Sequence, residues 1–357
     1  MKRCITLLLA LAMALALIPC GAVAEGDSAL KIGVLSYLNL TEEEFLARET
    51  AKEAALDYLE AHGMLELSEP KPEGDEAPSL QIRYYDTTDA LLMALQAGDI
   101  DAIQAPKSTA DYLCATNDRL VQPSVFNFPE SDAFVQSLLN QLSDGYAFMM
   151  LEANADLRDQ FNQAIADMRA DGTLDALVQK HIAEASRTGE TEAIAFEAFE
   201  GEPIRVAITG ALPPMDYVAP DGSFAGFNTA ILAEIGRRIG KNINYTQVDS
   251  NGRAMALASG TVDVVFWVRG IATGSKTINM TDEEFAAYKE EMEKDFTPEE
   301  KEAIARLDEI LPRVREYTRD MPEGTIITEP YYTDIPVGVM TKEVFDMYVQ
   351  MIKEKYQ

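Results

Sequence analysis

Residues 203–269 read PIRVAITGALPPMDYVAPDGSFAGFNTAILAEIGRRIGKNINYTQVDSNGRAMALASGTVDVVFWVR, and this stretch decides the fold. A short apolar run at residues 204–208 predicts a buried strand, and residues 242–248 and 262–268 are predicted as a second and a third strand. After Phe227 the apolar residues recur at helical spacing until Gly240, and a second, shorter helix is predicted to end at Gly260. Because strands alternate with helices, the stretch predicts a parallel sheet with right-handed crossovers.

Two pieces of this stretch carry a resemblance to a known family. They are PPMDYVAPDGSFAGFNTAILAEIGRRIG at residues 213–240 and ALASGTVDVVFWV at residues 256–268. Together they resemble the opening lobe of the type II periplasmic binding proteins, the solute receptors of ABC importers for amino acids and related small molecules. The resemblance implies an α/β fold of two lobes, in which parallel or mixed sheets are flanked by helices. It also implies hinge strands between the lobes, which close on a ligand.

The family's other elements occur in rotated order along the chain. Residues 144–182 resemble its closing segment, a strand that returns from the second lobe and two helices around the turn at residues 171–173. Residues 329–340 resemble the hinge strand that leaves the first lobe. The likeness of DALLMALQAGDIDAI to MALASGTVDVVF raises a tandem duplication as the alternative. Since each family element occurs about once, we predict one circularly permuted receptor, which exposed and neighbouring domain termini make tolerable.

The predicted organisation follows from that order. It comprises a signal peptide at 1–24, the second lobe at 30–144, the return strand and helices of the first lobe at 145–182, a Glu-rich linker at 183–202, the rest of the first lobe at 203–340 with a hinge strand at 330–340, and a C-terminal helix at 341–357. Residues 281–319 have no counterpart in the family pattern. Thr281 and Thr297 each precede acidic residues there, as helix N-caps do. We favour a solvated helical hairpin packed on the first lobe over a surface that docks on a membrane partner.

The composition limits the partners of the chain. Its 357 residues are 47% hydrophobic, which is enough for one or two ordinary cores. A formal net charge of -30 excludes nucleic acid as a partner and disfavours anionic lipid. We interpret this acidity as a solvated surface and not as a face that recognises cations. Cys114 is the only cysteine in the predicted folded part, so no disulfide is expected there. We expect a monomer that needs neither a cofactor nor a metal.

Residues 1–24 have the form of an export signal. A basic start precedes an apolar run that is too short for a membrane span. Residues 17–20 partly resemble a lipoprotein box, which would make Cys20 an acylated N-terminus, although Pro19 departs from the usual small residue. Residues 22–24 match the small-x-small site of ordinary signal peptidase instead. Both sites predict a periplasmic or extracellular protein, and the first adds a lipid anchor.

A ligand is expected beyond the carboxyl ends of the strands, where loops and helix N-termini converge. On the first lobe this rule selects Thr209, Met215, Asp216, Tyr217, Trp267 and Arg269 as ligand-binding candidates. On the second lobe it selects Tyr37 and Asn39 after one predicted strand, and Lys107 and Ser108 after another, at residues 100–103. The aromatic residues among them are candidates for apolar walls, although core packing is the commoner role of such residues.

Arg269 is the main candidate for holding a ligand carboxylate. A guanidinium presents a planar fork that matches a carboxylate, and Arg269 directly follows a predicted buried strand. The family's arginine lies further along, after a G-x-T element, so Arg269 would be a replacement. A salt bridge is its alternative role, and Arg253 is a weaker candidate for the carboxylate. The resemblance also implies an acidic residue for a ligand ammonium, but residues 104–106 are Gln-Ala-Pro, which leaves Asp216 of the other lobe.

The predicted function is that of an extracytoplasmic solute-binding protein. It would capture a small polar solute, an amino acid or a related carboxylate, and present it to an ABC permease in the membrane. The alternatives are an exported, dehydratase-like enzyme on the same fold and a binding module that serves as a sensor or adhesin. Catalysis needs a placed acid or base, and the candidates are His62, His181, Asp216 and Glu329. Because no nucleophile elbow, metal-ligand cluster or phosphate loop accompanies them, we predict no enzymatic activity.

Overall fold

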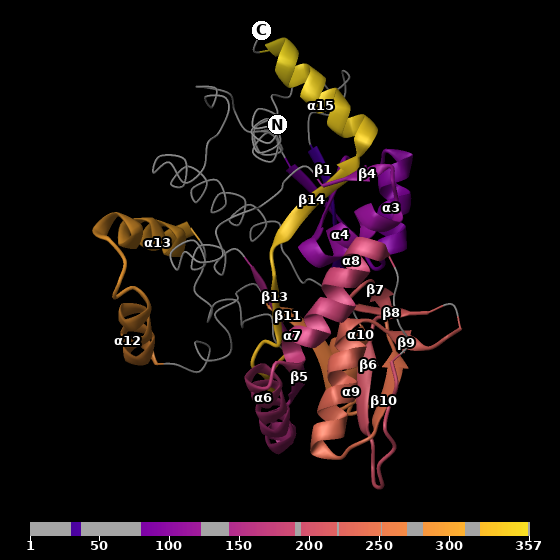
Figure 1. Ribbon diagram of the computed structural model, residues 1–357, viewed down its shortest axis with the longest axis vertical. Helices are drawn as coiled ribbons and strands as arrows, with labels where there is room; N and C mark the ends of the chain where they lie inside the picture. Colours follow the sequence, from indigo (N-terminus) through magenta and orange to yellow (C-terminus); the bar gives the residue numbers. More distant parts are fainter. Residues whose placement is uncertain are drawn as a thin grey trace.

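The computed structural model describes residues 30–36, 80–122, 143–189, 194–219, 221–250, 252–269, 281–310 and 322–355. Its strands form a five-stranded sheet, a six-stranded sheet and a small three-stranded one, with helices packed against them (Figure 1). We call the unit around the six-stranded sheet the first lobe and the unit around the five-stranded sheet the second lobe. The predicted fold class, mixed α/β with parallel and mixed sheets flanked by helices, is confirmed.

The second lobe is built on the strand order β2-β1-β3-β14-β4. Its strands are β1 (Leu30–Leu35), β2 (Leu80–Tyr85), β3 (Ala102–Pro106), β4 (Leu120–Val121) and β14 (Pro336–Thr341). Its described helices are α3 (Thr88–Ala97), α4 (Lys107–Thr116) and α15 (Lys342–Lys355). β1 runs parallel to β2 and β3, whereas β14 enters antiparallel to β3 and β4.

The first lobe has the strand order β10-β6-β11-β5-β12, and β13 also pairs with β5. Its strands are β5 (Asp144–Leu151), β6 (Ile204–Ile208), β10 (Ile243–Gln247), β11 (Val264–Arg269), β12 (Thr325–Ile327) and β13 (Tyr332–Asp334). The small sheet beside it holds β7 (Ala211–Leu212), β8 (Asp216–Val218) and β9 (Phe224–Ala225). β10, β6 and β11 are parallel, as the alternating pattern of residues 203–269 predicts.

The helices of the first lobe include α6 (Ala155–Ala170), α7 (Thr173–Val178), α9 (Phe227–Ile239) and α10 (Gly252–Ala258), with the short 3₁₀ turn η2 (Glu152–Asn154) before α6. The sequence signals predict the ends of α9 and α10 to within about one residue. α9 ends at Gly240, whose φ of 66° is the left-handed conformation that glycine adopts without strain. The turn predicted at residues 171–173 separates α6 from α7.

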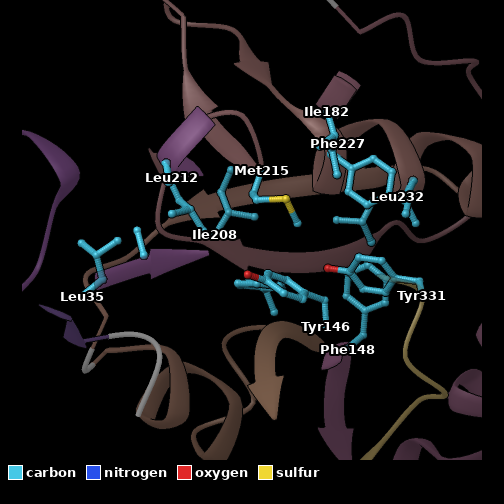
Figure 2. Close-up of a cluster of buried hydrophobic side chains, with 14 of the residues drawn as sticks. Leu35, Tyr146, Phe148, Ile182, Ile208, Leu212, Met215, Phe227, Leu232 and Tyr331 are labelled. Carbon is cyan, nitrogen blue, oxygen red and sulfur yellow. The ribbon is translucent and has the colours of Figure 1, made fainter. Parts of the chain in front are cut away.

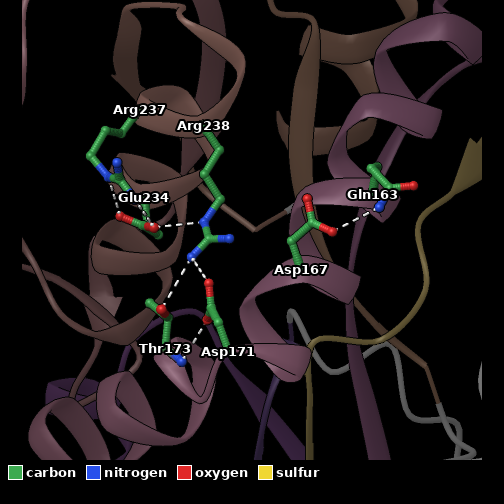
Figure 3. A network of polar contacts seen from close by, with 7 residues as sticks. All are labelled: Gln163, Asp167, Asp171, Thr173, Glu234, Arg237 and Arg238. Carbon is green, nitrogen blue, oxygen red and sulfur yellow. Dashed lines mark hydrogen bonds and ion pairs between the residues drawn. The ribbon is translucent and has the colours of Figure 1, made fainter.

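Arg238 of α9 fastens that turn (Figure 3). Its guanidinium donates to the Asp171 carboxylate at 2.7 Å and to the Thr173 hydroxyl at 3.1 Å, and it also bonds Glu234 one turn earlier in α9. Hydrogen bonds from Thr173 and Arg238 lower the pKa of the Asp171 carboxyl to about 2. The turn is therefore tied to α9 by a charged contact that persists at all but strongly acidic pH.

Two parts of the chain differ from the sequence-based expectation. The strand predicted at residues 100–103 begins later and ends at Pro106, because β14 pairs with it from Val339 opposite Ile103 to Pro336 opposite Pro106. The predicted linker is helical at its start, where η3 (Gln179–Glu184), a π-helical segment, and α8 (Ala185–Thr188) extend α7. α8 packs on α4, so this helical run reaches from the first lobe to the second (Figure 1).

The chain crosses between the lobes at β13 and β14. Only Ile335 separates these strands, yet β13 pairs with β5 in the first lobe and β14 pairs with β3 in the second. Thr333 lies directly opposite Gly145 in the β13–β5 pairing. The sequence places the hinge strands near these two residues, and the structure brings both to the crossing.

Buried aromatic and aliphatic side chains fill the space around this crossing (Figure 2). The Phe148 ring stacks on Tyr331 with centroids 4.6 Å apart and meets the edge of Phe161 at 5.5 Å. The same cluster includes Leu35 of the second lobe and Leu212 of the first. The lobes therefore share apolar packing as well as a chain crossing.

The helical pair predicted after Thr281 is present as α12 (Asp282–Met292) and α13 (Pro298–Ile310). Thr281 forms a reciprocal capping box with Glu284. Thr297 and Glu300 exchange the same two hydrogen bonds at the start of α13. These local contacts explain why both helices begin where their threonines predict. Among the residues that the structure describes, no helix combines the length and apolar character needed to span a bilayer.

Candidate functional site

The carboxyl ends of β6 and β11 lie at one edge of the first-lobe sheet, because these strands are parallel neighbours. The loop of residues 209–215 follows β6 there, and α9 begins against it. The Phe227 N–H donates to the Pro214 carbonyl at 3.0 Å, and the Asn228 N–H donates to the Met215 carbonyl at 2.8 Å. The first two N–H groups of α9 thus bond carbonyls of the loop, and these hydrogen bonds hold the loop in place.

Gly226 makes this approach possible. Its φ is 102°, and a Cβ atom at this position would lie 2.6 Å from the Met215 carbonyl oxygen. Real Cβ atoms do not come that close to backbone, so any other residue would push the loop away from α9. The position of the loop at the sheet edge depends on this glycine.

The buried carboxylate of Asp216 holds the loop of residues 209–215 in place through hydrogen bonds. One oxygen of its carboxylate, Oδ1, accepts the Thr209 hydroxyl at 2.9 Å and the Gly210 N–H at 3.1 Å. The Thr209 carbonyl in turn accepts the Gln247 amide at 3.1 Å. Burial raises the pKa of the Asp216 carboxyl, while the Thr209 hydrogen bond and the charge of Arg253 oppose that rise. The predicted ligand residues Thr209 and Asp216 therefore meet, and they bond each other.

Arg253 is the buried cation of this site. It is 1% exposed, and its guanidinium donates to the carbonyls of Ser250, at 3.1 Å, and Phe266, at 2.8 Å. Its charge acts on Asp216, which is also fully buried. Arg253 is the second residue of α10, and its side chain joins the start of this helix to the strand β11.

A tyrosine and an asparagine complete the polar cluster. The Tyr331 hydroxyl donates to Asn228 Oδ1 at 2.7 Å, and burial together with the Asp216 charge raises the pKa of Tyr331. Two buried atoms, Asp216 Oδ2 and Asn228 Nδ2, have no hydrogen-bond partner within the described part of the chain. An acceptor and a donor left over in a buried cluster are groups that a ligand or a water would satisfy.

The second lobe contacts this sheet edge through α3. The Thr88 hydroxyl, in the first turn of α3, donates to the Ala211 carbonyl at 2.8 Å and is buried between the lobes. A second link lies further away, where the Ser186 hydroxyl of α8 donates to the Ser108 carbonyl of α4 at 3.1 Å. Both hydrogen bonds join residues of different lobes, so they depend on the relative position of the lobes.

The remaining candidates lie in different surroundings. Lys107 and Ser108 begin α4, where the Lys107 amine pairs with Asp111 and the Ser108 N–H donates to Asp334. Met215 is buried and Tyr217 is half-buried in the loop region. The backbones of Trp267 and Arg269 lie in β11, opposite Ala147 and Gly145. Tyr37, Asn39, His62 and Cys20 lie outside the described residues, and His181 is buried in η3.

Three residues of the site were not singled out from the sequence. Thr88 follows an N-cap threonine, whose hydroxyl oxygen accepts the Ala90 N–H at 3.1 Å, and this start signal indicates a helix N-terminus near the site. Asn228 is a polar residue in an apolar run, which is a signal for a buried hydrogen bond. Tyr331 carries no local signal, since its partner is 103 positions away.

Replacing Thr88 with valine keeps the shape of the side chain but removes its donor. We expect the free energy of unfolding to fall by about 1 kcal/mol, because the half-buried Ala211 carbonyl loses this hydrogen bond. Chemical denaturation measures this change. Thr116→Val is the control, since the Thr116 hydroxyl bonds only carbonyls of its own helix, at 2.8 and 3.3 Å. Equal losses in the two variants would show that the contact between lobes contributes nothing.

The described residues offer no group of three or more His, Cys, Asp or Glu side chains placed to hold a metal ion.

Residues 204–289, which include the loop, α9, Arg253 and β11, match the family described as bacterial extracellular solute-binding proteins, family 3. This match confirms the predicted resemblance for the segment that it covers. No curated protein sequence matches the chain.

Several solved structures are similar at low identity. The ligand-binding component of an ABC-type import system from Staphylococcus aureus, with zinc bound, is 9% identical with a TM-score of 0.36, over 90% of this chain and 68% of that one. A periplasmic binding protein from Brucella ovis, with glutathione bound, is 10% identical with a TM-score of 0.34, over 88% of this chain and 62% of that one. The GluR0 ligand-binding core with L-glutamate is 10% identical with a TM-score of 0.34, over 93% of each chain.

Proposed function

We propose, from the premise that residues 204–289 have the pattern of family 3 solute-binding proteins, that this protein is an exported solute receptor without catalytic activity. It would hold a small polar solute between its lobes and present it to an ABC permease. The observation that carries the proposal is the place of the match, because the matched segment forms the sheet edge that faces the second lobe through Ala211 and Thr88. The proposed location is periplasmic or extracellular, with a lipid anchor if Cys20 is acylated.

Closure of the lobes would couple binding to recognition by the permease. The crossing at β13 and β14 joins the lobes, and the Thr88–Ala211 hydrogen bond forms only when they lie close together. A solute that contacts both lobes stabilises this arrangement over an open one, and it shifts the population toward the form with the lobes together. The rotated element order, in which one chain supplies each lobe once, is part of this proposal. It leaves the closure of the lobes unchanged.

The solute we propose is an amino acid or a related carboxylate. Arg269 ends β11 at the sheet edge and would hold the carboxylate as a bidentate partner. Asp216 Oδ2, a buried acceptor with no partner in the described residues, would receive an N–H or O–H donor of the solute. From Gln104, inside β3, the chain has no carboxylate until Asp111, which favours a solute that does not require an acid from this loop.

A thermal-shift screen of the purified protein tests this function. The panel holds amino acids, other carboxylates, short peptides and polyamines, because a ligand that binds only the folded state raises the melting temperature. At 100 times the dissociation constant the stabilisation is about 2.7 kcal/mol. Trp267 is the only tryptophan, so its fluorescence gives a second readout. Absence of any shift across the panel would refute the receptor, and turnover of a panel member would establish an enzyme.

Replacing Arg269 with alanine is expected to weaken binding of the stabilising carboxylate at least tenfold, about 1.4 kcal/mol or more, while leaving the melting temperature of the empty protein nearly unchanged. Titration calorimetry measures the affinity. Arg187→Ala is the matched control, since Arg187 is exposed on α8. An unaltered affinity in Arg269→Ala would assign that arginine to structure.

A further inference from the structure

Asp334 stands at the point where the chain crosses from one lobe to the other. It is the last residue of β13 and lies opposite Asp144 in the β13–β5 pairing. Only Ile335 separates it from β14 in the other sheet. Its side chain is buried, which is unusual for a carboxylate outside an ion pair.

The carboxylate joins the crossing strand to helix α4 of the second lobe. Asp334 Oδ2 accepts the N–H of Ser108, in the first turn of α4, at 2.9 Å, and Oδ1 accepts the N–H of Ile335 at 2.9 Å. The Lys107 N–H donates to the Ile335 carbonyl at 2.9 Å, so two hydrogen bonds tie the start of α4 to this point of the chain. A negative charge at a helix N-terminus is favoured, because unpaired N–H groups and the helix dipole point there.

Few charges surround Asp334 in the described part of the chain. Lys107 and Asp111 lie on α4, Tyr332 lies on β13 and Asp144 lies on β5. Lys107 is the cation among them, and its amine is already paired with Asp111. The negative charge of Asp334 is therefore held mainly by backbone N–H groups and not by a dedicated counter-ion.

The burial of this charge works against stability at neutral pH. Burial raises the pKa of the Asp334 carboxyl to about 6, although the hydrogen bonds from Ser108 and Ile335 lower it. The folded-state pKa lies above the ordinary value of 3.8, so the folded protein binds the proton more readily than the unfolded chain. Stability from this group is greatest in acid and is lost as the pH rises through about 6. A carboxylate that costs stability when charged, at a crossing between lobes, indicates a role other than folding.

We propose that Asp334 is a pH-sensitive brace between the lobes. Its hydrogen bond to Ser108 holds the crossing strand to the N-terminus of α4, and this contact keeps the lobes in one relative position. Ionisation loosens the brace, because the buried carboxylate has no dedicated counter-ion and gains hydration when the lobes part. The lobes then separate more readily. The consequence that the solute is held more tightly in acid rests on the proposed function, whereas the lobe movement does not.

Distance measurements between the lobes test this brace without any ligand. Met93 of α3 and Met255 of α10 are 70% and 74% exposed, one in each lobe, so cysteines at these two positions accept spin labels. The native cysteines Cys4, Cys20 and Cys114 are replaced by serine. Pulsed electron resonance then records the distance distribution at about pH 7.5 and about pH 5, on either side of the titration. We expect one narrow distance at the lower pH and a longer, broader distribution at the higher pH.

Asp334→Asn cannot acquire the charge, so its distribution is expected to be narrow at both pH values. Asp263→Asn is the matched control. Asp263 also accepts a backbone N–H, from Arg205 at 2.9 Å, but it does so within the first lobe, and its pKa is lowered. This variant should keep the response of the unsubstituted protein.

Three results would overturn the brace: a distance in the unsubstituted protein that does not change with pH, an unchanged response in Asp334→Asn, or loss of the response in Asp263→Asn. The first of these needs no variant at position 334, so a folding failure of Asp334→Asn leaves the test intact. If the distance responds to pH but no solute of the thermal-shift panel stabilises the protein, the brace is supported and only the receptor function is refuted.

Discussion

Arg253→Met is expected to lower the free energy of unfolding by about 3 kcal/mol. This is the largest loss that we expect from replacing a single polar residue of the site. The guanidinium is buried, and the substitution leaves the carbonyls of Ser250 and Phe266 without these donors. It also removes the positive charge that acts on Asp216. Methionine fills a similar volume but forms none of these contacts, so the loss reports the hydrogen bonds and the charge. Urea denaturation at neutral pH measures it.

Arg205→Met is the control for this prediction. Arg205 is paired with Asp263 at 2.6 Å, but its side chain is 47% exposed, so the pair is screened by solvent. We expect a much smaller loss in this variant than in Arg253→Met. If Arg253→Met cost no more than Arg205→Met, the buried guanidinium would have no part in holding α10 against β11. The site would then rest on the loop contacts of Asp216 alone.

Phe148→Ala lowers the free energy of unfolding by about 3 to 5 kcal/mol. Phe148 lies in β5 and stacks on the ring of Tyr331 (Figure 2). It also meets Phe161 in a T-shaped contact. Removing the ring leaves a cavity beside Tyr331. Because Tyr331 directly precedes β13, its ring cannot fill the cavity without moving that strand. Thermal and urea denaturation measure the change.

Two further variants separate packing from simple loss of an aromatic residue. Phe148→Leu keeps most of the apolar volume and is expected to cost less than about 1.5 kcal/mol. Phe196→Ala removes a ring that is 45% exposed, and we expect at most about 1 kcal/mol. Similar losses in Phe148→Ala and Phe196→Ala would contradict the central place of the aromatic cluster.

Local signals in the sequence predicted much of the secondary structure. The strand at Ile204–Ile208, the helix from Phe227 to Gly240 and the helix Lys342–Lys355 all occur where the apolar spacing and the caps place them. The capping threonine Thr281 also begins its helix as expected. Each of these features depends on residues within a few positions of one another, so the sequence by itself contains the information. The circular permutation, the domain limits and the ligand roles of the selected residues stay predictions.

The tertiary structure alone decided which polar groups meet. The end of β3 was misplaced because β14, which lengthens that strand, comes from the far end of the chain. The Thr88 hydroxyl finds the Ala211 carbonyl 123 positions away, and Asp334 finds Ser108 across 226 positions. No local spacing encodes such contacts, because they form only when two separately built sheets pack together. The sequence therefore determined the elements and the family pattern of residues 204–289, and the packing of the lobes determined the candidate site and the contact of Asp334 with α4.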